Sequence, residues 1–359
     1  MKAKQILMHS LIPLSMVVSA NSYALDVEAY GSLRMQGEFV SVDSVSAANA
    51  AAGEDDSYAA FRDAYSRIGV KASKSFEDIN VSAKLEFPIN LPQMQAEDPS
   101  FFEGFYKDNN SPRVASIGIS NDSFGSLTYG MQWLAYYNNI AYPVDYFSSF
   151  YSGFATHATF RREALTYSSP SFSGLQFTAS GVDMTDGGGT NYLDTQQYAL
   201  SYSLENFSTA IAYQDTHDNR ADLLGISASY TTGPWRFAAK YEQLQSNNTV
   251  VTNKDPAIYN LYASYTMDKL TFKALYSEGD GDTGNNDEGD AFFIGSSYHL
   301  GMDYQHQDNL KFFVEYFYEE NGYAIYTPDS ESFNPLAGYQ ADSDGTAIAV
   351  GVRYDFSTK

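Results

Sequence analysis

Apolar and polar side chains alternate strictly along residues 345–356 of the chain. The apolar positions, all of one parity, are Ile348, Val350, Val352, Tyr354 and Phe356. The positions between them carry small or charged side chains. A period of two over about ten residues is typical of a strand with lipid on one face and water on the other. Because the pattern recurs along nearly the whole chain, we predict an all-β protein, a transmembrane antiparallel β-barrel.

About sixteen strands are expected from this alternation. They are predicted near residues 27–39, 63–72, 81–87, 112–120, 124–132, 161–168, 174–182, 195–204, 207–215, 222–231, 235–245, 257–266, 269–278, 290–302, 310–319 and 345–356. Short links such as 205–206 alternate with long polar segments such as 183–194 and 321–344. Short turns on one rim and long loops on the other are typical of an outer-membrane barrel. One barrel domain, residues 25–359, accounts for the chain beyond its first 24 residues.

Those first 24 residues predict a targeting segment. Lys2 and Lys4 precede a mainly apolar stretch, residues 6–18, and a small-x-small cleavage site ends at Ala24. The apolar stretch is too short for a membrane anchor, which is the alternative interpretation. We therefore expect residues 1–24 to be a cleaved signal peptide of an exported protein.

Composition narrows the function. The formal net charge is −23, with 44 acidic against 21 basic residues, which argues against nucleic-acid binding because little basic surface is available to displace counterions. The chain has no cysteine, which excludes thiolate metal sites and cysteine nucleophiles. Its 30 tyrosines and 24 phenylalanines suit the aromatic girdles of a barrel in lipid. No stretch marks a catalytic or metal site, and we expect neither an enzyme nor a cofactor.

Basic side chains indicate which face of each strand meets water. An Arg or Lys that faces lipid near the bilayer midplane costs about 2–4 kcal/mol, so basic residues within strands are expected on the lumen face. Each of these has the polar parity of its strand: Arg34, Arg67, Lys84, Arg236, Lys240 and Arg353. A soluble β-barrel is the alternative, but it does not need this bias together with so many outward-facing aromatic side chains.

Four segments resemble the general bacterial porins of Gram-negative outer membranes. They are residues 65–71, 124–130, 165–175 and 350–356. Together with the strand rhythm, the resemblance covers essentially the whole mature chain. It implies a sixteen-stranded barrel, usually trimeric, whose third long loop folds into the lumen and narrows it.

The resemblance places this narrowing loop at residues 133–160, between the fifth and sixth predicted strands. Constrictions of the family commonly set acidic loop residues against arginines of the wall. The candidates are Asp145 on the loop and Arg34, Arg67, Arg113 and Arg162 on the wall. Further charges expected to face the lumen are Lys84, Arg236, Lys240 and Arg353. For each arginine, a solvated or lipopolysaccharide-binding charge is the alternative.

Two features depart from the family. Asp145 is the single carboxylate of the loop, fewer than such loops often carry. Porins usually end in a phenylalanine that the barrel-insertion machinery reads, but here Ser357, Thr358 and Lys359 follow Phe356. This tail either weakens that recognition or is tolerated.

We predict an outer-membrane porin that passes small hydrophilic solutes and ions by passive diffusion, as a homotrimer surrounded by lipid and lipopolysaccharide. Overall acidity favours a weak preference for cations. The main alternative is a substrate-specific channel, for example for sugars, with stacked aromatic rings along the lumen. Such rings could come from Tyr136, Tyr137, Phe147, Phe150 and Tyr151. A structural barrel with a closed lumen and a barrel hydrolase are further alternatives.

Overall fold

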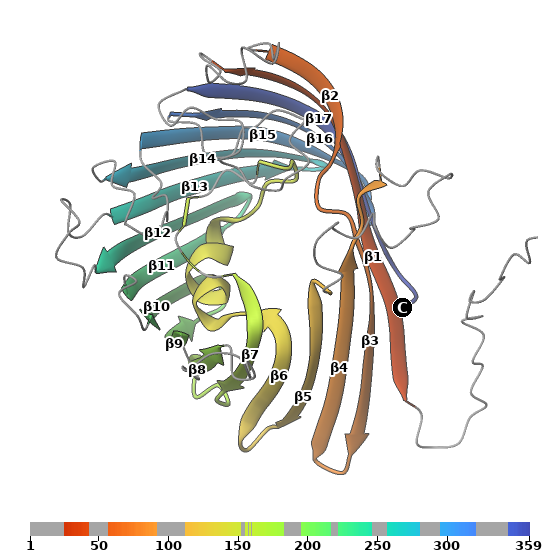
Figure 1. Ribbon diagram of the computed structural model, residues 1–359, viewed down its shortest axis with the longest axis vertical. Coiled ribbons are helices and arrows are strands. Elements are labelled where there is room, and N and C mark those ends of the chain that lie inside the picture. The colour runs from red at the N-terminus through yellow and green to blue at the C-terminus, as the bar shows by residue number, and fades with distance from the viewer. Residues whose placement is uncertain are drawn as a thin grey trace, which may run out of the picture.

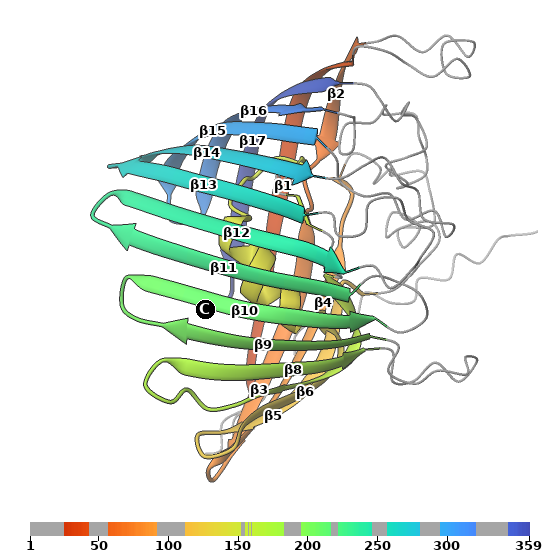
Figure 2. The ribbon, with the colours of Figure 1, turned by 90° about the vertical axis from the view of Figure 1, so that its left-hand side faces the viewer.

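The computed structural model shows one curved sheet that closes on itself (Figure 1, Figure 2). The described residues are 25–42, 57–91, 112–151, 155–156, 158, 160–182, 195–216, 222–245, 257–280, 295–320 and 344–359. The expected signal peptide lies outside the described residues. Within the described ranges, no helix is long and apolar enough to span a bilayer.

Seventeen antiparallel strand segments form the described sheet. Their bounds are β1 Asp26–Val42, β2 Ser57–Asp63, β3 Arg67–Phe76, β4 Ile79–Pro88, β5 Val114–Asn121, β6 Gly125–Trp133, β7 Arg161–Ser168, β8 Leu175–Val182, β9 Thr195–Ser203, β10 Phe207–Thr216, β11 Asp222–Thr232, β12 Trp235–Gln245, β13 Ala257–Met267, β14 Leu270–Asp280, β15 Gly295–Gln307, β16 Leu310–Glu319 and β17 Gly345–Ser357. From β3 to β17, each strand pairs with the next in chain order. Tight turns join these strands at one end of the barrel (Figure 2).

β2 and β3 are two halves of one broken strand, so the barrel has the sixteen strands expected from the sequence. β2 ends at Asp63, β3 begins at Arg67, and both pair with β1. Between them Tyr65 has a φ of 67°, a left-handed conformation that interrupts the regular pleat. The Ala64 N–H nevertheless donates to the Arg34 carbonyl oxygen at 3.1 Å. The break therefore leaves this backbone donor satisfied.

The barrel closes where its last strand pairs with its first. Residues 30–42 of β1 lie opposite residues 345–357 of β17. One residue further on, the Thr358 N–H donates to the Ala29 carbonyl at 2.9 Å, and the Ala29 N–H donates to Thr358 Oγ1 at 3.0 Å. The residues after Phe356 therefore extend the seam of the barrel.

Polar and apolar side chains face opposite sides of the wall. On β1, Glu38 is 3% exposed, whereas the next residue, Phe39, is 69% exposed. The same alternation on β16 buries Glu315 and exposes Val314. In a membrane, the exposed apolar face meets lipid and the other face encloses the lumen.

The first long loop is shorter than the sequence predicts. A loop over residues 40–62 is expected, but β1 continues to Val42 and β2 already begins at Ser57. Ala59 and Ala60 lie side by side in β2 and hide its period of two, because alanine suits either face. Alternation alone therefore does not reveal this strand.

Replacing Val350 by arginine tests the orientation of the strands. Val350 is 55% exposed on the outward face of β17, near its middle. An arginine there faces hydrocarbon, so we expect Val350→Arg to lower the free energy of unfolding by about 2–4 kcal/mol. Urea titration of the protein folded in lipid vesicles measures this loss.

Thr346→Arg is the matched control, because Thr346 lies on the same face of the same strand but close to its end. Near the membrane interface the same substitution costs at most about 1 kcal/mol. Equal losses in the two variants would contradict the orientation described above.

Candidate functional site

The described part of the segment between β6 and β7, residues 134–151, 155–156, 158 and 160, runs inside the barrel. Figure 1 shows its two helical pieces as yellow coils against the inner wall. They are a π-helix, η2 (Tyr137–Ala141), and a 3-10 helix, η3 (Tyr142–Val144). η2 contacts β10 and β11, and η3 contacts β11, β12 and β13. We call the described residues of this segment the inner loop.

An apolar cluster holds the start of the inner loop against the wall. Tyr136 is fully buried and packs with Ile140 against the inner face of β9 to β12. The wall side chains of this cluster are Ala199, Ala210, Ala212, Leu223 and Leu244. Gly225 of β11 leaves room for the ring, because a Cβ there would lie 2.2 Å from the Tyr136 hydroxyl oxygen. The Tyr136 N–H also donates to Gln197 Oε1 at 2.7 Å.

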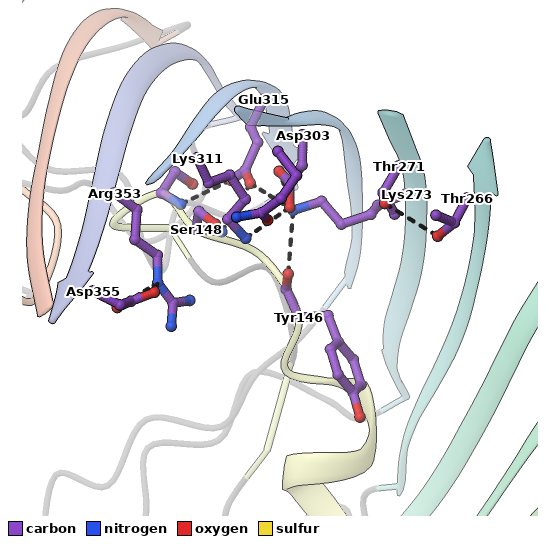
Figure 3. Close-up of polar contacts among 12 residues, drawn as sticks. Tyr146, Ser148, Thr266, Thr271, Lys273, Asp303, Lys311, Glu315, Arg353 and Asp355 are labelled. Carbon is purple, nitrogen blue, oxygen red and sulfur yellow. Dashed lines mark hydrogen bonds and ion pairs between the residues drawn. The ribbon is translucent and has the colours of Figure 1, made fainter. Parts of the chain in front are cut away.

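A buried carboxylate holds the middle of the inner loop (Figure 3). Glu315 of β16 accepts the N–H of Ser148 at 2.8 Å and that of Ser149 at 2.9 Å. Lys273 of β14 donates to the same carboxylate at 3.0 Å and to the Tyr146 carbonyl at 3.2 Å. The loop backbone and the wall therefore share one ion pair.

Neighbouring charged side chains and one histidine complete this cluster. Asp303 lies 2.9 Å from Lys273 and 2.8 Å from Lys311. His299 Nε2 lies 3.2 Å from Glu315 Oε2. A buried charge without a partner is strongly destabilising. Each of the groups in this cluster has at least one partner. The cluster is thus a structural part of the wall, held by its own ion pairs and hydrogen bonds.

The following part of the inner loop is held by the first strand. The Phe150 N–H donates to Gln36 Oε1 at 2.8 Å, and the Tyr151 hydroxyl donates to Glu38 Oε2 at 2.9 Å. Both acceptors are on the lumen face of β1. This is a further attachment of the inner loop to the wall, after the apolar cluster and Glu315.

Asp145 directly follows η3 and lies opposite a group of arginines. The Tyr137 hydroxyl donates to Asp145 Oδ2 at 2.7 Å. Burial raises the pKa of Asp145, although the hydrogen bond from Tyr137 acts in the opposite direction. Three positive charges also lower it: Arg34, Arg113 and Arg67. The structure thus brings together four of the five residues predicted to form the constriction.

A row of arginines crosses the seam of the barrel on its lumen side. Arg34 of β1 lies directly opposite Arg353 of β17, and Arg67 of β3 lies opposite Ser32 of β1. Arg353 Nε donates to both carboxylate oxygens of Asp355, at 3.0 and 2.7 Å. Three adjacent strand segments therefore each contribute one guanidinium group.

Arg113 joins this group although it has the parity of outward-facing side chains such as Ile117. It precedes β5, which begins at Val114, so the pleat of the strand does not fix its direction. Arg113 Nε lies 2.9 Å from Glu86 Oε1 on the lumen face of β4. Its position at a strand end therefore decides where its side chain points.

Two of the predicted residues lie elsewhere. Arg162 shares the lumen parity of Ala164 on β7, but its side chain is exposed and it is not among the charges that act most strongly on Asp145. Lys240 faces inward on β12, where it is buried and lies 2.9 Å from Glu242. Glu242 also accepts a hydrogen bond from the inner loop, so Lys240 is covered rather than open to the lumen.

The remaining predicted charges face the lumen with different partners. Lys84 of β4 lies 3.6 Å from Glu86. Arg236 of β12 packs over the ring of Tyr146 on the inner loop, with 4.7 Å between its Cζ and the ring centroid. Both side chains therefore line the inside of the barrel.

The five rings considered as an aromatic slide are buried, each at most 9% exposed. Phe150 stacks on Tyr65, and Tyr151 stacks on Phe317. These two stacked pairs attach the inner loop to the wall. Tyr142, which was not among them, is 54% exposed.

The residues that hold the inner loop were not identified from the sequence. Glu315 gives one local signal, because it is a carboxylate at a central position of an otherwise largely apolar strand. Its partners lie 166 and 167 residues away along the chain. That distance is why alternation alone did not pair them.

Comparisons with known proteins agree with this architecture. A family model described as Gram-negative porin matches residues 10–324. Among curated proteins, no sequence matches significantly.

Solved structures of outer-membrane proteins share the fold. OmpF of Salmonella typhi, in complex with daunomycin, is 21% identical, with a TM-score of 0.64 over 93% of this chain and 98% of that chain. An anion-selective porin from Comamonas acidovorans is 15% identical, with a TM-score of 0.65 over 93% and 100%. OmpT of Vibrio cholerae, in a trimer form, is 17% identical, with a TM-score of 0.62 over 93% and 100%.

Removing the Glu315 carboxylate tests the attachment of the inner loop. Glu315→Ala leaves two buried loop N–H groups without their acceptor and deprives Lys273 of one partner. We expect the free energy of unfolding to fall by about 3–5 kcal/mol, the usual cost of breaking a buried pair from one side. We also expect added noise in the open-channel current, because the loop gains freedom.

Glu278→Ala serves as the control, because it removes a carboxylate from the outward face of β14, the strand that carries Lys273. Its open-channel noise is expected to match that of the unmodified protein. A quiet current and unchanged stability in Glu315→Ala would show that the carboxylate does not hold the loop.

Proposed function

The chain belongs to the Gram-negative porin family, and on that premise we propose that small hydrophilic solutes and ions diffuse passively through its lumen. Its family and fold are those of outer-membrane channels. Passage of this kind needs neither catalysis nor a cofactor. Size and charge at the narrowest part of a water-filled pore then determine the rates.

The observation that carries this proposal is the meeting of charges between the inner loop and the seam of the barrel. Asp145 belongs to the loop, and Arg34 and Arg67 belong to the facing wall. Asp145 and Arg67 are both partly exposed. Charged groups without complete pairing need water, because their transfer to a dry interior is costly. The space between loop and seam therefore suits water and dissolved solutes.

A sugar-specific channel is the second candidate, but the burial of its proposed rings argues against it. Sugars bind aromatic slides through exposed ring faces, whereas Phe150 and Tyr151 are engaged with the wall. Tyr142 alone of the inner-loop tyrosines exposes more than half of its surface. One ring is not a continuous slide. Non-selective diffusion is therefore the better supported function.

The assembly and export of the protein form part of the same proposal. OmpT of Vibrio cholerae, whose fold is similar, has been solved in a trimer form, and we expect this chain to form a homotrimer in the outer membrane. Residues 1–24 would act as a cleaved signal peptide. Lipid and lipopolysaccharide would surround the trimer.

Purified protein in liposomes tests the diffusion mechanism. We expect swelling in sugars of increasing size, at rates that fall smoothly with solute size and show no saturation. Liposomes prepared without protein give the background rate. Saturable uptake of one sugar would favour the substrate-specific channel, and absence of swelling for every solute would refute a diffusion pore.

A further inference from the structure

We infer that Arg34 and Arg67 form an oxyanion-binding pair inside the pore and that the channel therefore prefers anions to cations. The inference rests on the proposed pore and adds the class of solute that it favours. The pair lies on the lumen face of adjacent strands, β1 and β3, beside the seam of the barrel.

The two guanidinium groups differ from their basic neighbours in their partners. Arg34 Nε donates to Ser32 Oγ at 3.0 Å, and Arg67 Nη1 donates to the Tyr65 carbonyl at 3.3 Å. Both acceptors are uncharged. Among the described residues, neither arginine forms an ion pair with a carboxylate, and most of their N–H groups are left for another acceptor.

The neighbouring basic residues are neutralised locally. Arg113 lies 2.9 Å from Glu86, and Arg353 lies 2.7 Å from Asp355. These two carboxylates are occupied by the closer partners, although each also acts at longer range on the pair. The positive charge that is not locally compensated is therefore concentrated on Arg34 and Arg67.

Crowding of like charges makes this position receptive to an anion. Arg353 is directly opposite Arg34, an arrangement of like charges that is destabilising within a sheet. Arg67 also acts electrostatically on Arg34 from the other side. An anion held between Arg34 and Arg67 relieves both repulsions. The wall is thus preorganised for negative charge.

The local balance of charge opposes the balance of the whole chain. The charged side chains that act most strongly on the pair and its partners are the basic Arg34, Arg67, Lys84, Arg113 and Arg353 and the acidic Glu86, Asp145 and Asp355. Positive charges exceed negative ones there, whereas the chain carries a net charge of −23. At 1 M salt the Debye length is about 3 Å, so distant acidic residues are screened and the close charges decide selectivity.

Guanidinium chemistry defines the class of solute. Its planar fork of N–H donors matches two oxygens of a carboxylate or phosphate. Two forks on adjacent strands can therefore hold one such group from two sides. The expected solutes are small molecules that carry a carboxylate or a phosphate. Binding must remain weak for the solute to leave again.

Reversal potentials in planar bilayers test the inference with the full-length mature protein. In a gradient between 1 M and 0.1 M KCl, we expect the reversal potential to have the sign that corresponds to a higher permeability for chloride than for potassium. Each lost charge weakens anion attraction by up to about fivefold, the factor for a charge at about 4 Å in water. Arg34→Gln/Arg67→Gln should therefore bring the chloride-to-potassium permeability ratio to one or below.

Inorganic phosphate is the probe for the binding site itself. Added at constant ionic strength, it should reduce the chloride current of the unmodified channel in a saturable manner. The double variant should lose this block. The single variant Arg67→Gln, which keeps the Arg34–Ser32 hydrogen bond, should show an intermediate effect and serves if the double variant does not fold.

Lys269→Gln is the matched control, because it removes one positive charge from the exposed turn between β13 and β14, away from the pore lining. Its permeability ratio and phosphate block should remain those of the unmodified protein. If the unmodified channel opens but prefers potassium, the anion site is refuted and the proposed pore is not. The same holds if the double variant keeps its selectivity and its phosphate block. A protein that forms no channel would overturn the proposed pore and this inference together.

Discussion

The structure depends on the closure of backbone hydrogen bonds around the whole barrel. In hydrocarbon an unpaired N–H or C=O costs several kcal/mol, so a sheet in lipid must have no free edge. The seam between β1 and β17 meets this requirement over residues 30–42 and 345–357, and Thr358 continues it. At the break between β2 and β3, Ala64 still donates to a carbonyl of β1. Closure therefore tolerates an interruption only where the donors find other acceptors.

Closure also decides which side chains can act on a solute. A strand paired on both sides has its parity fixed, so a polar residue is directed either to the lumen or to lipid. Arg34, Arg67 and Arg353 share the lumen side because their strands pair in this register. The parity of a strand does not fix the direction of Arg113, because this residue lies just before β5. The arginine group is thus a product of sheet register and of one strand end.

The sequence allowed the strand order, the parity of basic residues and the position of the inner loop to be predicted, because each depends on local alternation or on chain order. It did not reveal β2, where two adjacent alanines hide the period. Nor did it reveal the attachment of the loop, because Glu315 and Ser148 are distant in the chain and meet only in the closed barrel. Lys240 shows the same limit, since its parity is inward but only the folded loop determines that it is covered.

Some buried charges in this barrel hold the inner loop, and others face the lumen. The first kind is paired with opposite charges, and the second is not fully paired. Lys240 and Glu242, like Lys273 and Glu315, lie in ion pairs that the inner loop covers or completes. Displacing the loop would leave such groups unpaired in a confined space, at a cost of about 1–3 kcal/mol for each unsatisfied donor or acceptor. Displacement would also expose the apolar cluster around Tyr136. These costs keep the loop against the wall, so the width of the opening is a fixed property of the fold. With the width fixed, charge is the remaining variable, and it is incompletely paired on Arg34 and Arg67 beside the seam.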